Sequence, residues 1–355
     1  MTYELANFAT RVSEFIRHSD ADPQGFNSLA LELFGLQFAL NVPYRKFCKA
    51  RGVTPLTATH WSQIPAMPTA AFKEFELTSL VPAERTHVFH SSGTTGQSPS
   101  RHFHGAESLA VYEASLLAGF RLQFPEPAEL LILTPPPAQA PNSSLVHMFE
   151  VVRREVGSAR NSFVGKLAAD GAWTLELDRT LARLQQSSEA VTPLLLLGTA
   201  FSFVHLLDFL VERSLRVELP AGSRVLETGG YKGRSRMLPK TELHGMITRR
   251  LGVPPSHIIC EYGMSELSSQ AYDHLTGATR VFQFPSWARA QIFSPESGLE
   301  VSNGETGLIR VVDLANLFSV IAIQTEDLGI RRGEGFELFG RAEFAEPRGC
   351  SLMAV

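Results

Sequence analysis

Residues 90–97 of this sequence, His-Ser-Ser-Gly-Thr-Thr-Gly-Gln, place four hydroxyl side chains and two glycines within six residues. The stretch follows the apolar pair Val88-Phe89 and precedes a long helix that is predicted from about Glu107. Backbone N–H groups and hydroxyls of such a loop can point at one set of anionic oxygens, and glycine permits their close approach. The loop is a candidate phosphate site, with a solvated turn as the alternative. A P-loop nucleotide hydrolase is disfavoured, because Gln97 stands where that motif needs a lysine.

A second segment makes the first more informative. It is Glu261-Tyr262-Gly263-Met264-Ser265-Glu266, and it comes directly after the strand-like residues 257–260. Further motifs follow one order along the chain: Thr228-Gly229-Gly230, then the second segment, then Gly304-Glu305-Thr306-Gly307-Leu308, Thr325-Glu326-Asp327-Leu328-Gly329 and Gly340-Arg341. The combination is much more specific than any one of its parts.

Taken together, these motifs resemble the core motifs of the adenylate-forming superfamily, which includes acyl-CoA synthetases, adenylation domains and luciferases. Within it the chain is most similar to the short acyl-protein synthetase branch of LuxE type, on Phe72-Lys73, the hydroxyl loop and Arg348-Gly349-Cys350-Ser351-Leu352. The resemblance implies an α/β fold: a large N-terminal domain of sheets flanked by helices, with a small β-rich subdomain. It also implies ATP and Mg²⁺ as cofactors.

The resemblance assigns a nucleotide role to most of the motif residues. Ser265 would bond the α-phosphate, Glu266 would help to hold Mg²⁺, and Asp327 would accept the ribose hydroxyls. The remaining expected contacts are the β- and γ-phosphates for Ser91, Ser92, Gly93, Thr94, Thr95 and Gly96, adenine for Tyr262 with Gly263, the purine for Gly229 and Gly230, and the sugar or phosphate for Arg341.

Three further residues are candidates with strong structural alternatives. Arg101 stands close to where many relatives carry a lysine after the loop, but an exposed arginine is an equal alternative. Lys232 is a basic residue beside the expected nucleotide, and a solvated lysine is its alternative. His147 resembles the histidine that lines the acyl pocket in relatives, and a core histidine is the alternative.

The resemblance implies that Cys350 is the acyl acceptor, because this branch uses a cysteine near the C-terminus for that role. It lies near the end of the chain beside Arg348 and Gly349, where a nearby cation favours the nucleophilic thiolate. Cys48 and Cys260 are predicted to be small buried residues instead. The acyl group would pass from an acyl-adenylate to Cys350 as a thioester, and then to a partner such as an acyl reductase or a carrier protein.

The chain stops a few residues after Gly340-Arg341, where longer relatives begin a C-terminal lid domain with a catalytic lysine. We therefore expect no lid domain, and Mg²⁺ with Arg101, Lys232 or Arg341 would supply the positive charge.

Two other functions stay open at this point. One is a ligase that delivers acyl or aryl groups to coenzyme A or to a carrier-protein thiol. The other is a non-catalytic subunit that binds nucleotide or acyl chains. The acid itself is expected to be a carboxylic acid, with a fatty acid favoured.

The pattern along the chain predicts four segments. Residues 1–60 keep helical spacing of apolar residues, 61–280 form an α/β core, 281–340 form a β-rich subdomain and 341–355 form a tail. Strands of the α/β core are expected at 86–89, 130–133, 194–197, 224–227 and 257–261. Later strands are expected at 281–284, 289–293, 308–312, 320–324 and 336–338.

Composition excludes several classes of protein. The 355 residues are 44% hydrophobic and 19% charged with a net charge of −4, so a packed protein is expected and nucleic acid is not an expected partner. The apolar residues 191–211 include Pro193, His205 and Asp208, which favour a buried strand, a turn and an amphipathic helix over a membrane span. Three scattered cysteines and the absence of a leader pattern suggest a cytoplasmic location.

Overall fold

The computed structural model describes residues 3–18, 23–91, 98–125, 129–230, 235–277 and 279–342. Several candidate residues lie outside these described ranges: Ser92, Gly93, Thr94, Thr95, Gly96, Lys232 and Cys350.

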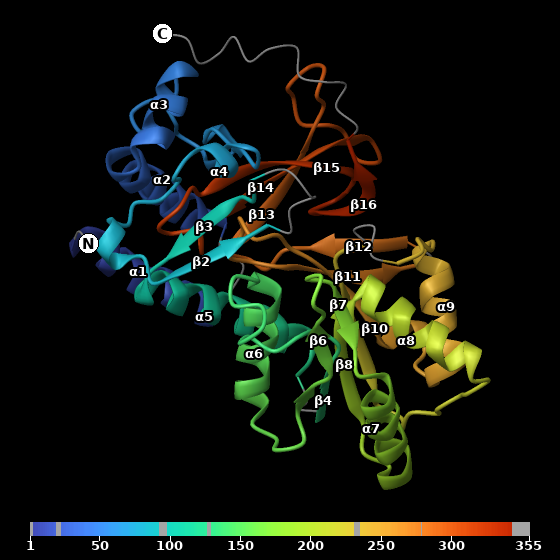
Figure 1. The fold of residues 1–355 in the computed structure, drawn as a ribbon. Coiled ribbons are helices and arrows are strands. Elements are labelled where there is room, and N and C mark those ends of the chain that lie inside the picture. Colours follow the sequence, from blue (N-terminus) through green and yellow to red (C-terminus); the bar gives the residue numbers. More distant parts are fainter. Residues whose placement is uncertain are drawn as a thin grey trace.

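One twelve-stranded mixed sheet organises the described part of the chain (Figure 1). Its order is β13 (Ala288–Phe293), β14 (Thr306–Asp313), β15 (Ala322–Arg332), β16 (Gly335–Arg341), β12 (Thr279–Gln283), β11 (Ala271–Thr276), β10 (Ile258–Tyr262), β9 (Arg224–Thr228), β8 (Leu194–Thr199), β4 (Glu129–Ile132) and β5 (Ser162–Phe163), with β1 (Met67–Pro68) pairing beside β15. β10, β9, β8, β4 and β5 run parallel, while β11 to β16 pair antiparallel.

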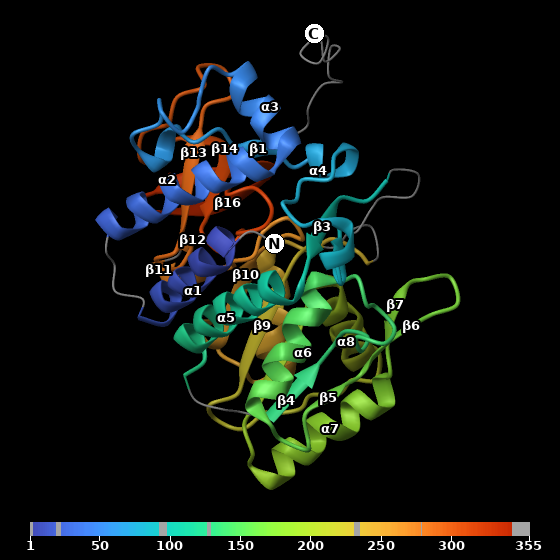
Figure 2. The same cartoon turned by 90° about the vertical axis from the view of Figure 1, so that its left-hand side faces the viewer.

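The parallel strands are buried on both faces, as their continuous apolar runs predict. One face packs against α5 (Ala106–Gln123) and α6 (Ser144–Val156), and Figure 2 shows these helices in front of the strands. The other face packs against α7 (Leu177–Ala190), α8 (Ala200–Glu212) and α9 (Lys240–Leu251). The carboxyl ends of β8, β9 and β10 therefore open together at one edge, which is where ligands bind in sheets of this kind.

The antiparallel half is covered by the N-terminal helices α1 (Tyr3–His18), α2 (Pro23–Leu40) and α3 (Val42–Ala50). These helices and strands β11 to β16 share one apolar core, although they lie at opposite ends of the sequence. Strands on both sides of residue 280 hydrogen-bond into the same sheet, through β11 and β12. The division of the chain into four segments stays a prediction.

Two short hairpins lie outside the main sheet: β2 (His87–His90) with β3 (Arg101–His104), and β6 (Gly165–Leu167) with β7 (Trp173–Leu175). The strand expected at 86–89 therefore pairs with β3 and not with the sheet of the α/β body. The sequence analysis missed β3, because Arg101–His104 reads as a polar and aromatic run between a loop and a helix. The remaining short elements are α4 (Ala71–Glu74) and three 3₁₀ turns at Trp61–Gln63, Pro82–Glu84 and Pro255–His257.

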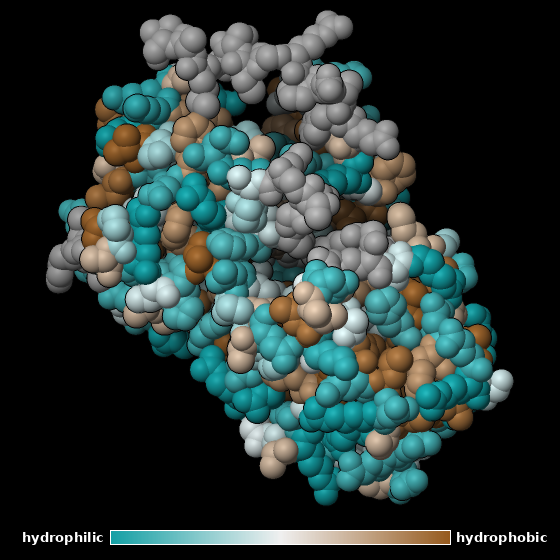
Figure 3. All heavy atoms as spheres, viewed as in Figure 1, coloured by the Kyte–Doolittle hydropathy of each residue, from teal (hydrophilic) through white to brown (hydrophobic). Residues whose placement is uncertain are grey.

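Residues 191–211 include β8 and most of α8, as expected for a strand and a helix, but α8 follows β8 directly and no turn separates them. α8 is buried along most of its length, so it is more apolar than the predicted amphipathic helix. Among the described helices, none is long and apolar enough to cross a membrane. On the face shown in Figure 3, hydrophilic residues alternate with scattered hydrophobic ones over the parallel half.

Candidate active site

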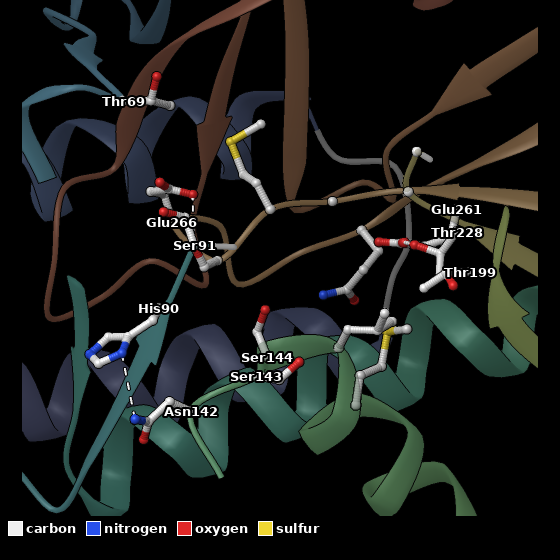
Figure 4. Close-up of a pocket in the computed structure, with 18 of the residues that line it drawn as sticks. Thr69, His90, Ser91, Asn142, Ser143, Ser144, Thr199, Thr228, Glu261 and Glu266 are labelled. Carbon is white, nitrogen blue, oxygen red and sulfur yellow. Dashed lines mark hydrogen bonds between the residues drawn. The ribbon is translucent and has the colours of Figure 1, made fainter. Parts of the chain in front are cut away.

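A cavity of about 880 Å³ lies at the carboxyl ends of β8, β9 and β10, beside the β2–β3 hairpin and β15. This volume is in the range of about 300–1,000 Å³ that is typical of small-molecule sites. The cavity brings together the predicted site residues Ser91, Gly229, Gly230, Gly263, Ser265, Glu266, Asp327 and Arg341. Figure 4 shows Ser91 and Glu266 on one side of it and Thr228 and Glu261 on the other.

The two ends of the hydroxyl loop lie at this cavity. Ser91 and Ser98 both line it. The Ser91 amide donates to the Ser100 carbonyl at 3.3 Å, and the Ser100 amide donates to the Ser91 hydroxyl at 3.0 Å. These two bonds join the two ends of the loop at the end of the β2–β3 hairpin, beside the cavity.

Ser265 and Glu266 form the turn after β10, and the fold fixes their backbone from two sides. His102 of β3 donates from Nδ1 to the Ser265 carbonyl at 2.8 Å, and the Asn316 amide group donates to the Glu266 carbonyl at 3.0 Å. The Ser265 hydroxyl donates to Glu266 Oε2 at 3.0 Å. Both side chains are more than nine-tenths buried yet line the cavity. A hydroxyl and a carboxylate are therefore held in fixed positions there, and such hard oxygen donors fit Mg²⁺.

Asp327 on β15 faces the same cavity from the antiparallel half. Tyr262 donates its hydroxyl to Asp327 Oδ2 at 2.9 Å. Burial raises the pKa of Asp327, and the bond from Tyr262 opposes this rise. Tyr262 thus binds one carboxylate oxygen of Asp327 and orients the carboxylate at the cavity.

Tyr262 lies behind the cavity wall. Its ring packs edge-on against Phe282, Phe284 and Phe336, and it is 7% exposed. Among the described residues, Tyr262 does not line the cavity, so the structure gives it the role of orienting Asp327. Stacking of Tyr262 on adenine stays a prediction.

Glycine is needed at two of the predicted positions for different reasons. Gly229 has a φ of +67°, in the left-handed region that other residues rarely adopt, and a side chain added there would meet open space. At Gly263 an added Cβ would meet the carboxylate of Glu261, which Thr228 binds through its hydroxyl. Gly263 therefore keeps room for the Thr228–Glu261 pair at the cavity edge.

Two of the predicted cations, Arg341 and Arg101, lie among the described residues, and only Arg341 lines the cavity there. Arg341 lines the cavity and pairs with Glu326 at 2.8 Å, with 72% of its side chain exposed. Arg101 is not among the described lining residues; its nearest acidic partner is Glu76 at 3.9 Å. Lys73 of α4 does line the cavity. Lys73 was predicted only as part of the Phe72-Lys73 motif, so the structure adds it as a candidate cation.

His147 lies in α6 beside the cavity, outside its described lining. Its Nε2 is 2.9 Å from Glu113 Oε1, and this bond lowers the pKa of Glu113. Residues of the same helix and of the turn before it, such as Ser143, Ser144 and Leu145, line the cavity instead. The role of His147 in an acyl pocket stays a prediction.

An apolar wall completes the cavity, and the sequence analysis did not identify it. It consists of Tyr112 of α5, Leu145 and Met148 of α6, Trp173 of β7 and Phe201 of α8. Each of these residues resembles an ordinary core residue in the sequence, and only the fold brings them together. The cavity thus combines this apolar wall with polar groups, which include both ends of the hydroxyl loop and the carboxylates of Glu266 and Asp327.

His102 gives the site a testable pH dependence. Burial lowers the pKa of His102 from 6.5 to about 4, although its bond to the Ser265 carbonyl opposes the shift. The unfolded chain therefore takes up this proton first as the pH falls, and stability is lost between about pH 6.5 and 4. We expect the His102→Gln variant to lose about 1.4 kcal/mol less per pH unit in this range than the wild type, in urea unfolding. Equal slopes for the two proteins would contradict this assignment.

Comparison with known proteins supports the predicted fold and family. A family model described as "Acyl-protein synthetase, LuxE" matches residues 13–354. The long-chain-fatty-acid--luciferin-component ligase of Vibrio harveyi is 22% identical over 326 residues, which cover 88% of this chain and 82% of that protein.

Solved structures share the fold at low sequence identity. The structure of 2-hydroxyisobutyryl-CoA ligase in complex with 2-HIB-AMP and CoA is 15% identical, with a TM-score of 0.65, over 90% of this chain and 68% of that chain. The ATP-bound MatB from Rhodopseudomonas palustris is 19% identical, with a TM-score of 0.50, over 75% of this chain and 50% of that chain, so this chain spans half of its length. These similarities confirm the fold class that the motifs predicted.

Proposed function

Because the chain belongs to the LuxE acyl-protein synthetase family, we propose that it activates a carboxylic acid with ATP as an acyl-adenylate and transfers the acyl group to Cys350. A fatty acid is the favoured substrate class, and an acyl reductase or a carrier protein is the favoured recipient.

One observation carries this proposal: a single cavity holds both ends of the hydroxyl loop, the Ser265-Glu266 turn and Asp327. These groups come from the loop between β2 and β3, from the turn after β10 and from β15, and each suits a different part of a nucleotide. Hydroxyls and amides suit phosphate oxygens, Glu266 suits Mg²⁺, and Asp327 suits hydroxyl donors such as those of ribose.

The proposed first step joins the acid to the nucleotide. A carboxylate oxygen of the acid attacks the α-phosphorus of ATP, the bond to the β-phosphate oxygen breaks, and pyrophosphate leaves. Two anions must approach each other, so catalysis depends on positioning and on compensation of negative charge. Mg²⁺ supplies positive charge when bound, and Glu266 with Ser265 would hold it. Lys73 and Arg341 line the cavity and are the described cations closest to this chemistry.

Arg101 and Lys232 remain proposed contributors to the first step. Arg101 lies on the same hairpin as the hydroxyl loop, one residue from Ser100, whose hydroxyl is 3.4 Å from that of Ser265. Lys232 follows the cavity residue Gly230 by two positions.

The apolar wall supports an acyl chain as the substrate. Trp173, Phe201 and Met148 offer hydrocarbon and aromatic surface, which would stabilise an alkyl chain by removing it from water. The wall and the polar groups line the same cavity, so a chain on this wall can present its carboxylate to the nucleotide.

The second step transfers the acyl group to sulfur. The thiolate of Cys350 attacks the acyl carbon, AMP leaves with the electron pair of the broken C–O bond, and a thioester forms. Cys350 follows the cavity residue Arg341 by nine residues, and a chain of that length spans at most about 30 Å. This reach is enough to bring the sulfur to the acyl carbon within the cavity.

The test combines ATP, Mg²⁺ and a series of labelled fatty acids with the purified protein. We expect AMP to form only when an acid is present, together with a mass increase of one acyl group that hydroxylamine removes. AMP formation without labelling, until coenzyme A or a carrier thiol is added, would contradict transfer to Cys350 and favour the thiol-ligase alternative. If neither AMP nor the acyl adduct forms with any acid, the result would contradict the enzymatic function.

A further inference from the structure

Glu227, Cys260 and His244 form a buried polar cluster directly behind the cavity. Glu227 and Cys260 are register neighbours on the parallel strands β9 and β10. Their side chains point to the face that α9 covers, and α9 supplies His244. The next pair along the same strands, Thr228 and Glu261, lines the cavity. The cluster and the cavity therefore lie on opposite faces of the same two strands.

The three side chains converge on one point. Cys260 Sγ is 3.1 Å from Glu227 Oε2 and 3.7 Å from His244 Nε2, and His244 Nε2 is 3.4 Å from Glu227 Oε2. Ligand atoms around a tetrahedral zinc ion lie about 3.3–3.7 Å apart, because zinc bonds to oxygen, nitrogen and sulfur measure about 2.0–2.3 Å. The separations in this cluster are close to those of one face of such a tetrahedron.

A second observation points to a missing ligand. Glu227 is 1% exposed, and its other carboxylate oxygen, Oε1, has no hydrogen-bond partner among the described residues. A buried carboxylate oxygen without a partner costs free energy, so native proteins usually satisfy it with a donor, a water or an ion.

We propose that Glu227, His244 and Cys260 bind a divalent metal ion, and that the ion is Zn²⁺. A thiolate, an imidazole and a carboxylate together suit zinc, whereas Mg²⁺ and Ca²⁺ prefer oxygen ligands alone. On binding, the Cys260 thiol releases its proton to solvent and its sulfur forms the bond to the metal. The fourth position falls to a water or to Glu227 Oε1.

Lys240 lies at the solvent side of the proposed metal site and is the charged neighbour of Glu227. It lies one helical turn before His244 on α9, and its Nζ is 3.5 Å from Glu227 Oε2. Its side chain is 42% exposed, so the ammonium can move into solvent when the metal takes over the negative charge of Glu227. The competing arrangement is a Glu227–Lys240 ion pair that binds no metal, and the experiment below separates the two.

The metal would have a structural effect on the cavity. It would fasten α9 to β9 and β10 at the residues that precede Thr228 and Glu261. Metal ligands from three separate elements stabilise the folded state, since the unfolded chain does not hold them together. The site would thus position the cavity edge without contact with nucleotide or acid.

The test uses untagged protein in a Cys350→Ser background, so that Cys260 and Cys48 are its only thiols. We expect about one zinc per chain by elemental analysis, and a thiolate-to-metal charge-transfer band when Co²⁺ replaces it. Substitution Cys260→Ser should remove the band and weaken zinc binding by about tenfold or more, while Cys48→Ser should leave both unchanged. Cys48 is the matched control, because it is also fully buried but lies in the core under the N-terminal helices.

The protein that keeps both Cys48 and Cys260 decides the outcome even if the Cys260→Ser variant fails to fold. A protein that binds less than about one-tenth equivalent of zinc under saturating zinc, and that shows no Co²⁺ band, would overturn the proposal in favour of the Glu227–Lys240 pair. A Co²⁺ band that persists in Cys260→Ser would overturn it too. Neither measurement uses ATP or a fatty acid, so a failure of the metal-site proposal can be distinguished from a failure of the proposed function.

Discussion

Replacing Glu266 by glutamine is expected to lower acid-dependent ATP–pyrophosphate exchange on the order of 10²–10³-fold. Glu266 lines the cavity, is 6% exposed and accepts a hydrogen bond from Ser265. Glutamine keeps its shape but removes the negative charge, so the site binds Mg²⁺ less well and aligns the phosphates less accurately. Exchange measured over a range of Mg²⁺ concentrations should also show that the variant needs more metal.

Glu326→Gln is the matched control for this substitution. Glu326 lines the same cavity but is partly exposed, and its carboxylate pairs with Arg341 at 2.8 Å. We expect exchange to fall by about fivefold at most, because an exposed ion pair contributes little. Exchange that is equal in the Glu266→Gln variant and the wild type would contradict the assigned role of Glu266.

Replacing Cys350 by serine is expected to abolish the acyl adduct while acid-dependent pyrophosphate exchange continues. The thiolate is a far better nucleophile toward an acyl-adenylate than a serine hydroxyl, whereas the first step does not involve sulfur. Intact-mass measurement with and without hydroxylamine detects the thioester, and exchange in the same sample reports the first step.

Cys48→Ser should keep the adduct. Cys48 is fully buried, and this burial raises the pKa of its thiol to about 12, so it is a poor nucleophile at neutral pH. An adduct that persists in Cys350→Ser, or one that disappears in Cys48→Ser from a folded protein, would contradict the choice of Cys350 as acceptor.

The sequence predicted the part of the site that lies on continuous motifs. β8, β9 and β10 were expected within one to two residues of where they lie, because a strand buried on both faces is a continuous apolar run. The turn at Ser265-Glu266 comes shortly after the end of β10, so the prediction of this strand also predicted that the turn lies at the sheet edge.

Residues whose place depends on tertiary packing were not predicted. The ring of Tyr262 joins the aromatic cluster of β12 and β16, and its hydroxyl reaches Asp327, 65 residues away; neither contact was predicted. The expected contact of Tyr262 with adenine stays a prediction. The apolar wall comes from four separate elements, and none of its residues differs in the sequence from ordinary core.

Cys260 shows how a correct prediction can be incomplete. It was expected to be buried, and its side chain is fully buried. Its neighbours are not apolar, because the register of β9 with β10 and the position of α9 bring Glu227 and His244 to its sulfur. His244 and Glu227 lie 16 and 33 residues before Cys260 in the sequence, so no local motif contains all three residues.

The central claim is that the cavity joins a carboxylic acid to the α-phosphate of ATP. Its most direct test is a reaction with a fatty acid that carries oxygen-18 in both carboxylate oxygens, followed by mass analysis of the nucleotide after acyl transfer. If a carboxylate oxygen attacks the α-phosphorus, each AMP retains one oxygen-18. Unlabelled AMP, or ADP with labelled phosphate, would contradict adenylate formation.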